Sequence, residues 1–224
     1  GEDSTTVIKN FTLRNGIGWE NNGSAILMGG GDYAGSPGPK LENLCITQNS
    51  FSTGGNAITS FGSTFSLKNS RIINNYGRAL SLQGTQLSTI DNVLITGNGK
   101  GVEINGGAAP VFTNVTISNH VGEINYVVFI QSSTPTFKNT LIVGNKHGIF
   151  TENNGSLTMI NSTIEDIFSN SDNQTLVGSI DVIHSHHVIE HVYDIDKSMI
   201  NIKSLLKDDG LLFVLVPNWI RDEP

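Results

Sequence analysis

The stretch TFSLKNSRIINNYGRALSLQG, residues 64–84, is one unit of a repeat that recurs along most of this chain. Within it, Asn69 follows Leu67 by two residues and precedes Ile72 by three. The same spacing occurs seven times, around Asn10, Asn43, Asn69, Asn92, Asn114, Asn139 and Asn161. Successive asparagines are 33, 26, 23, 22, 25 and 22 residues apart. A repeat of this length indicates a solenoid, in which each repeat forms one coil of a stack.

Alternating apolar residues within each repeat predict short β-strands, and the Asn and Gly residues between them divide each coil into three. The apolar residues beside each asparagine, such as Ile95, are expected to point inward. A third inward column is predicted at Ile26, Ile58, Leu80, Val102, Val128 and Ile149. One coil cannot bury its own apolar face, so stacking must supply the core. Since Asn tolerates left-handed backbone angles, we expect each repeat asparagine to sit at a bend and bond to the next coil.

Residues 1–175 are therefore predicted to form an all-β parallel solenoid of about seven coils. The phrases NSRIINNYGRALSLQG and NVLITGNGKGVEINGG, at 69–84 and 92–107, resemble repeats of the pectate-lyase-like superfamily. That resemblance implies a right-handed parallel β-helix, a fold that polysaccharide-active enzymes and surface adhesins share. It implies little about activity, because one fold hosts many functions. Two insertions, at 29–39 and 121–126, are expected to leave the coils as loops.

Residues 176–224 follow a different pattern and are predicted to form a small α/β segment. An apolar run at 178–184 reads as a strand, apolar residues at helical spacing span 188–207, and 211–216 reads as a second strand. Asp208, Asp209 and Gly210 are expected to end the helix. A strand, a helix and a strand in this order indicate a parallel βαβ unit.

The strings IDVIHSHHVIEHVYD and LLKDDGLLFVLVPN, at 180–194 and 205–218, resemble the C-terminal part of class I methyltransferases that use S-adenosylmethionine. The resemblance implies that His184, Ser185 and His186 would face that cofactor. The family's Gly-rich loop and the acidic residue that hold the cofactor have no counterpart here. We therefore expect no cofactor, and S-adenosylmethionine only if the missing half were supplied. Alternatively, the segment is a structural cap on the last coil, with Met199, Ile202 and Leu206 packed on Ile160 and Ile164. A further alternative is that the segment comes from an unrelated gene that has been fused to the β-helix.

Composition excludes several partners. The net charge of −7 and the lack of clustered Lys and Arg argue against nucleic acid. No apolar run is long enough to predict a membrane span. The single Cys45 excludes an internal disulfide framework. The chain opens at Gly1 without an initiator Met, which suggests a trimmed end or a fragment. The fold resemblance favours an extracellular or cell-surface location.

Candidate binding residues come from the outward columns beside the third core column. The first column is predicted to contain Leu27, Thr59, Ser81, Glu103, Phe129 and Phe150, and the second Gly29, Phe61, Gln83, Asn105, Gln131 and Glu152. The proposed binding face is Thr59, Ser81, Glu103, Phe129, Phe150 and Glu152. Phe129 and Phe150 look exposed, unless an inserted loop covers them. Glu103 and Glu152 lie two coils apart, with no Lys or Arg expected beside them, so no catalytic residue is assigned.

Three functions remain open. The first is a non-catalytic binding or adhesion module for a polysaccharide or a surface protein, and the second is a polysaccharide-active lyase or hydrolase. The third is a methyltransferase of which only the tail is present. A metal site is a further alternative, because His187, Glu190 and His191 match the H-x-x-E-H pattern of inverted zinc proteases. His184 and His186 add nearby imidazoles, but no acidic ligand on a second helix is evident, so no metal is assigned.

Overall fold

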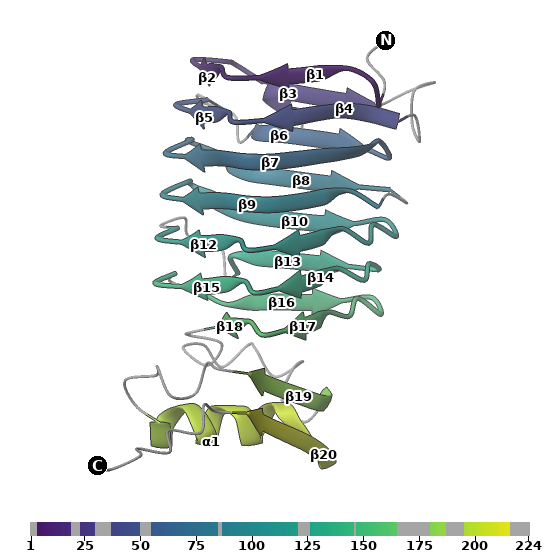
Figure 1. The fold of residues 1–224 in the computed structure, drawn as a ribbon, viewed down its shortest axis with the longest axis vertical. Helices are drawn as coiled ribbons and strands as arrows, with labels where there is room; N and C mark the ends of the chain where they lie inside the picture. Colours follow the sequence, from purple (N-terminus) through teal and green to yellow (C-terminus); the bar gives the residue numbers. More distant parts are fainter. Residues whose placement is uncertain are drawn as a thin grey trace, which may run out of the picture.

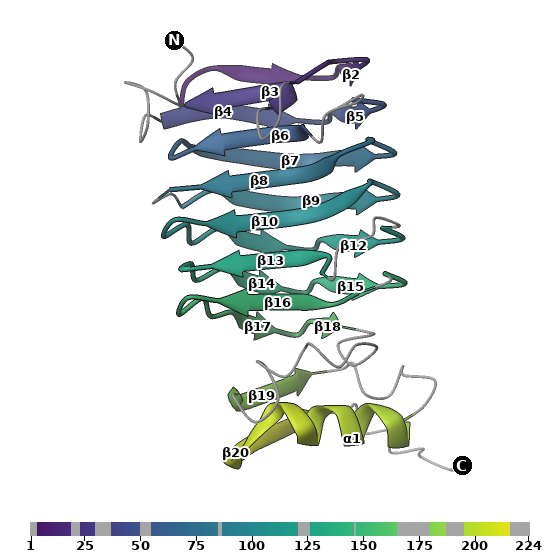
Figure 2. The ribbon, with the colours of Figure 1, turned by 180° about the vertical axis from the view of Figure 1, so that it is seen from behind.

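The computed structural model describes residues 4–18, 23–29, 37–49, 55–84, 87–120, 126–145, 147–164, 180–186 and 195–215. It is a tall stack of parallel coils with the N-terminus at one end and a small α/β segment beyond the other (Figures 1 and 2). Two sheets run the length of the stack, one of twelve strands and one of six, and their strand pairings are all parallel.

The larger sheet wraps two sides of each coil. Its main path contains β1 (Val7–Lys9), β4 (Pro37–Glu42), β7 (Thr64–Ile73), β9 (Thr89–Thr96), β11 (Val111–Thr113), β14 (Thr136–Lys138) and β17 (Thr158–Ile160). Its remaining strands are β2 (Thr12–Arg14), β5 (Cys45–Thr47), β12 (Thr116–Ser118), β15 (Leu141–Val143) and β18 (Thr163–Ile164). The six-stranded sheet contains β3 (Gly23–Gly29), β6 (Asn56–Phe61), β8 (Arg78–Gln83), β10 (Lys100–Asn105), β13 (Val128–Gln131) and β16 (Ile149–Glu152). The predicted parallel β-solenoid is confirmed.

The repeat asparagines form an exposed ladder at the bend between the two sides of the larger sheet. All seven have left-handed backbone angles, with φ of 50° at Asn69 and 54° at Asn92, as expected for residues that turn the chain sharply. The side-chain amide of Asn92 donates to Asn69 Oδ1 at 2.8 Å, and that of Asn139 donates to Asn114 Oδ1 at 3.3 Å. The predicted bend is confirmed at all seven positions. The predicted side-chain bonding between coils is confirmed in part, since the described bonds join Asn10 to Asn43, Asn69 to Asn92 and Asn114 to Asn139.

A second ladder is buried inside the stack, six residues beyond each exposed-ladder asparagine from Asn43 to Asn139. It consists of Asn49, Asn75, Asn98, His120 and Asn145, each no more than 5% exposed. Asn49 Nδ2 donates to Asn75 Oδ1 at 3.0 Å, and Asn75 Nδ2 donates to Asn98 Oδ1 at 2.8 Å. The same amides also bond to backbone groups of neighbouring coils. The ladder therefore satisfies polar backbone at a turn that would otherwise be buried unpaired.

The apolar core fills the space between the sheets in stacked columns. Ile46, Ile72, Ile95, Ile117 and Ile142 form one column and are fully buried. A second column contains Phe112 and Phe137, whose rings stack 4.8 Å apart, and continues to Met159. The third predicted column is also inward, with Ile58, Leu80, Val102, Val128 and Ile149 buried and Ile26 partly buried and packed against the core. Because each column repeats an apolar residue at the strand spacing, every coil supplies the surface that its neighbour needs.

The C-terminal segment contains β19 (Ile180–His186), α1 (Ile195–Leu205) and β20 (Leu206–Leu215), and its two strands are parallel. The order of these elements is strand, helix and strand, but their limits differ from the predicted ones. The helix ends at Leu205, before the predicted stop at Asp208, Asp209 and Gly210. These three residues lie within β20. Ile180 pairs with Leu206 and Val182 with Leu211, so residues 207–210 bulge out of the ladder. The part of the predicted helix at 188–194 lies outside the described residues.

The segment lies beyond the last coil, and β19 is next to β17 (Figure 1). Leu205 belongs to the buried core, and Ile183 packs against it. The predicted contact of Met199 with Ile160 does not bury either residue, since each remains 38% exposed. The C-terminal segment therefore covers the last coil only in part. Strand β19 contributes to this contact at least as much as α1 does. The domain boundary at 175/176 lies outside the described residues and stays a prediction.

Candidate functional site

The six-stranded sheet carries the two outward columns that the sequence predicted. Strand pairing aligns Leu27, Thr59, Ser81, Glu103, Phe129 and Phe150 in the first column. The second column aligns Gly29, Phe61, Gln83, Asn105, Gln131 and Glu152. Both alignments are as predicted, because the core residues between them fix the register.

Two of the predicted binding residues are not accessible. Thr59 and Ser81 are fully buried, although the strand pairing places them in the outward column. Both hydroxyl groups are hydrogen-bonded to neighbouring polar side chains, Thr59 to Asn56 and Ser81 to Glu103 and Gln83. The accessible part of the predicted face narrows to Glu103, Phe129, Phe150 and Glu152, which are all partly exposed.

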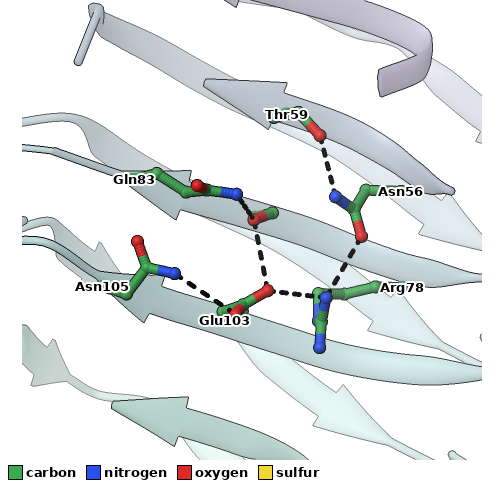
Figure 3. Close-up of polar contacts among 7 residues, drawn as sticks. Asn56, Thr59, Arg78, Gln83, Glu103 and Asn105 are labelled. Atoms are coloured by element: carbon green, nitrogen blue, oxygen red, sulfur yellow. Dashed lines mark hydrogen bonds and ion pairs between the residues drawn. The ribbon is translucent and has the colours of Figure 1, made fainter. Parts of the chain in front are cut away.

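Glu103 forms the centre of a polar network on this sheet (Figure 3). Its Oε2 lies 2.6 Å from Arg78 Nη1, in an ion pair whose side chains are 9% and 16% exposed for Arg78 and Glu103. Ser81 Oγ donates to the same oxygen at 3.4 Å, and Asn105 Nδ2 donates to Oε1 at 3.2 Å. Both carboxylate oxygens are therefore occupied, and the charge of a mostly buried arginine is balanced in place.

The network extends from Glu103 on β10 across β8 to β6 (Figure 3). Arg78 Nη1 also donates to Asn56 Oδ1 at 3.3 Å, and Asn56 Nδ2 donates to Thr59 Oγ1 at 2.9 Å. Gln83 Nε2 donates to Ser81 Oγ at 3.0 Å. The expectation that no basic residue stands beside the acids is wrong. Arg78 lies at the start of β8, outside the columns that the sequence analysis compared, and its long side chain reaches one coil across to Glu103.

Phe129 and Phe150 are covered by a third aromatic residue. The ring of Tyr126 lies 4.8 Å from that of Phe129 and 5.8 Å from that of Phe150, and the two phenylalanine rings are 5.9 Å apart. All three planes lie within 25° of one another. Tyr126 is the last residue of the second predicted insertion. Tyr126 therefore covers the pair only in part, since Phe129 and Phe150 both remain partly exposed.

The aromatic cluster and the polar network share one electrostatic environment. Burial raises the pKa of the Tyr126 phenol, and the charge of Arg78 opposes that effect. Burial also lowers the pKa of Lys100, and Arg78 adds to the lowering while Glu103 opposes it. Glu152 accepts a short hydrogen bond from Gln131 Nε2 in the neighbouring strand. The sheet thus combines a flat aromatic surface with fixed amides, carboxylates and two cations.

Sequence reasoning missed Arg78, Lys100 and Tyr126. A signal for the first two was present, since Asn56, Arg78 and Lys100 occupy aligned positions at the starts of three successive strands. The backbones of neighbouring coils also approach closely beside Lys100. A Cβ at Gly101 would lie 2.0 Å from the carbonyl oxygen of Val127, so only glycine fits there. Tyr126 could not be predicted from the repeat, because it lies before β13 and outside the aligned strand positions.

The C-terminal candidates are described only in part. His184, Ser185 and His186 lie in β19, and their proposed role toward S-adenosylmethionine stays a prediction. His187, Glu190 and His191 lie outside the described residues. Within the ranges that the structure covers, no group of three or more His, Cys, Asp or Glu residues is placed to hold a metal ion. No helix in the same ranges has the length and apolar character needed to cross a membrane.

Comparison with known proteins agrees with the geometry. A family model described as a right-handed β-helix region matches residues 1–127 and again residues 66–186. The chain matches none of the curated proteins and none of the solved structures with which it was compared. The family match overlaps every coil of the stack, including the strands that carry Arg78, Glu103 and Phe150. By its repeats, its parallel coils and this match, the chain belongs to the right-handed β-helix family.

Proposed function

We propose that this protein is a non-catalytic module, extracellular or surface-attached, that binds a neutral glycan on the outer face of the six-stranded sheet. The observation that carries the proposal is the aromatic cluster of Tyr126, Phe129 and Phe150 beside the network of Glu103. An aromatic surface suits the C–H face of a sugar ring, and a few fixed polar groups suit its hydroxyl groups.

The bonding of the two acids supports binding over hydrolysis. A general acid or base must exchange a proton with the substrate, so one of its oxygens must be open to it. Glu103 instead uses both oxygens within the protein, toward Arg78, Ser81 and Asn105. Glu152 is engaged by Gln131. Fixed acceptors of this kind favour recognition, because they are already oriented before a ligand arrives.

The test is binding to immobilised neutral polysaccharides, followed by calorimetry with oligosaccharides of the one retained most strongly. Tyr126→Ala should weaken binding about tenfold or more, as loss of an aromatic anchor does. Leu27→Ala is the matched control, because Leu27 is apolar and 51% exposed. It lies in the same outward column as Phe129 and Phe150, at the other end of the six-stranded sheet. Equal binding by wild type and Tyr126→Ala would contradict the proposal.

One observation favours a polysaccharide lyase of the pectate-lyase-like group as the second candidate. A lyase needs a base that removes a proton beside a sugar carboxylate, and a lysine with a lowered pKa near a second cation suits that role. Lys100 has both properties, since burial and Arg78 lower its pKa. Incubation with polyuronates, followed by ultraviolet absorbance of the unsaturated product, tests this function. Activity lost in Lys100→Met but kept in Lys138→Met, which changes an exposed lysine of β14, would replace the binding proposal.

A further inference from the structure

We propose that the larger sheet carries a surface through which two copies of this chain associate as a dimer. The surface is an outward column of four charged residues on β1, β4, β7 and β9, which lie side by side along the stack (Figure 1). Strand pairing aligns Lys9 with Glu42, Glu42 with Lys68, and Lys68 with Asp91. We call these four residues the charge column. It belongs to a different sheet from the aromatic cluster, so this inference does not rest on the proposed function.

The charges of this column are not neutralised by ion pairs within the described part of the chain. Lys9 and Lys68 are exposed, and Glu42 and Asp91 are half-buried. The ion pair described in this structure joins two residues of the other sheet, and Asp91 Oδ1 accepts a long hydrogen bond of 3.4 Å from Asn114 Nδ2. Opposite charges therefore alternate at the strand spacing of about 4.8 Å and stay available to a partner with the same spacing.

The order of the charges is self-complementary. When two stacks meet face to face through a twofold axis parallel to their strands, they run in opposite directions, and the column faces its own copy in reverse order. With the axis between Glu42 and Lys68, Lys9 of each copy faces Asp91 of the other, and Glu42 of each faces Lys68 of the other. All four contacts then join opposite charges, which is the complementarity that a specific interface needs.

Other arrangements of the same face bring like charges together. An axis parallel to the stack would place every residue opposite its own copy, lysine on lysine and acid on acid. Moving the strand-parallel axis by half a coil, onto Glu42 or onto Lys68, would also place that residue opposite itself. Moving it by a full coil would place Lys9 opposite Lys138 of the other copy. Because like charges in contact weaken binding, the charge column favours one orientation and one register.

The neighbouring outward column is compatible with this register. Two residues before the charge column, strand pairing aligns Val7, Lys40, Ser66 and Thr89. In the same arrangement Val7 faces Thr89 and Lys40 faces Ser66, so no like charges meet. The contact spans four coils, which is about 14 Å along the stack at the strand spacing. A contact this small belongs with transient interfaces, so we expect a weak dimer that depends on salt.

Sedimentation equilibrium of the whole chain at low and high salt tests the association. Raising the ionic strength from about 0.01 M to about 1 M shortens the Debye length from about 30 Å to about 3 Å, so the dissociation constant should rise about tenfold or more. A monomer at low salt and about 0.1 mM protein would overturn the proposal, because even transient specific dimers are detectable there. A dimer that is equally tight at both salt concentrations would overturn it as well.

Charge reversal at the two central residues tests the register. Glu42→Lys alone and Lys68→Glu alone each place like charges opposite one another on both sides of the axis, so each variant should be monomeric. An equimolar mixture of the two variants restores opposite charges at all four contacts and should dimerise about as tightly as wild type. A mixture that stays monomeric would overturn the arrangement, and so would dimerisation of either variant alone.

The matched control is Lys138→Glu, which makes the same change of charge as Lys68→Glu. Lys138 is an exposed lysine of β14 in the same outward column, beyond the four coils of the contact. The dimer should therefore persist in this variant. Equal loss of the dimer in Lys138→Glu and Lys68→Glu would assign the effect to net charge and overturn the surface. Far-ultraviolet circular dichroism of each variant checks that the fold is intact.

Discussion

The two asparagine ladders use the same side chain under opposite conditions. The exposed ladder at Asn69 and Asn92 turns the chain, and its amides face solvent. The buried ladder at Asn75 and Asn98 has almost no exposure, and each amide forms bonds to the next amide and to backbone groups. Water can replace a lost bond in the first ladder and cannot do so in the second. The exposed ladder should therefore tolerate substitution, whereas the buried ladder is needed for the stack.

The largest effect is expected from Ile95, which lies three residues from a member of each ladder. Ile95→Asp would place an unpaired carboxylate in a fully buried column, and it should cost several kcal/mol and abolish folding of the middle coils. The measurement is thermal unfolding followed by circular dichroism. A melting temperature within about two degrees of wild type would show that Ile95 does not point inward. Leu94→Asp is the control, because Leu94 is 36% exposed in the same strand.

Breaking the buried ladder should have the next largest effect. Asn75→Ala removes the acceptor of Asn49 and the donor to the Ile46 carbonyl, and it leaves these buried groups without partners. Since each such group costs about 1–3 kcal/mol, a loss on the order of 3 kcal/mol or more is expected. Urea unfolding measures the free energy. A loss below about 1 kcal/mol would mean that water enters the turn and takes over these bonds.

His120 makes the buried ladder sensitive to pH. Asn98 Nδ2 can only donate, so His120 Nε2 accepts at 3.4 Å and Nδ1–H donates to Asn145 Oδ1 at 3.0 Å. This tautomer is neutral, and burial lowers the pKa of His120 in the folded state. The unfolded chain therefore binds the proton first, and stability falls as the pH decreases below about 6.5 toward the folded pKa.

The check compares urea unfolding of wild type and His120→Asn at about pH 7.5 and about pH 5, on either side of an ordinary histidine pKa. Asparagine restores the residue type of the ladder, so the variant should lose less stability than wild type on acidification. Carboxylates contribute equally to both proteins and cancel in the difference. The same pH dependence in both proteins would refute this role of His120.

The smallest effect is expected in the exposed ladder. Asn92→Ala places a Cβ-bearing residue without a compensating amide at φ of 54°, which should cost about 1 kcal/mol. Asn92→Gly keeps the backbone conformation and loses only one exposed bond to Asn69, so its cost should be about 0.5 kcal/mol or less. Urea unfolding of the two variants separates conformation from bonding. Equal losses of unfolding free energy in the two variants would show that the hydrogen bond, and not the backbone conformation, accounts for the effect.

Much of the fold was accessible from spacing alone. The repeat around Asn69 predicted the bends, the inward columns and the alignment of Glu103 with Phe129, because a regular stack translates sequence register into spatial register. The buried ladder had a signal too, since its members lie six residues beyond the exposed ones. It was not identified, because an Asn in a turn reads as an exposed residue until its neighbours are known.

The candidate site was accessible only in part. Glu103, Phe129, Phe150 and Glu152 were predicted to share one outward face, but Arg78 and Tyr126 were not placed on it. The pairing of Arg78 with Glu103 depends on a long side chain that crosses from one coil to the next. The position of Tyr126 depends on where an inserted segment returns to the stack, which no repeat specifies.

The sequence by itself determined the parallel stack, its core columns and its asparagine bends, because these follow from local spacing repeated at a fixed period. Only the tertiary structure decided which outward side chains are accessible. It buried Thr59 and Ser81 and placed Tyr126 over two phenylalanines. The reason is physical: a core column needs only the same residue type in each coil, whereas a binding surface depends on how unlike side chains from different coils meet.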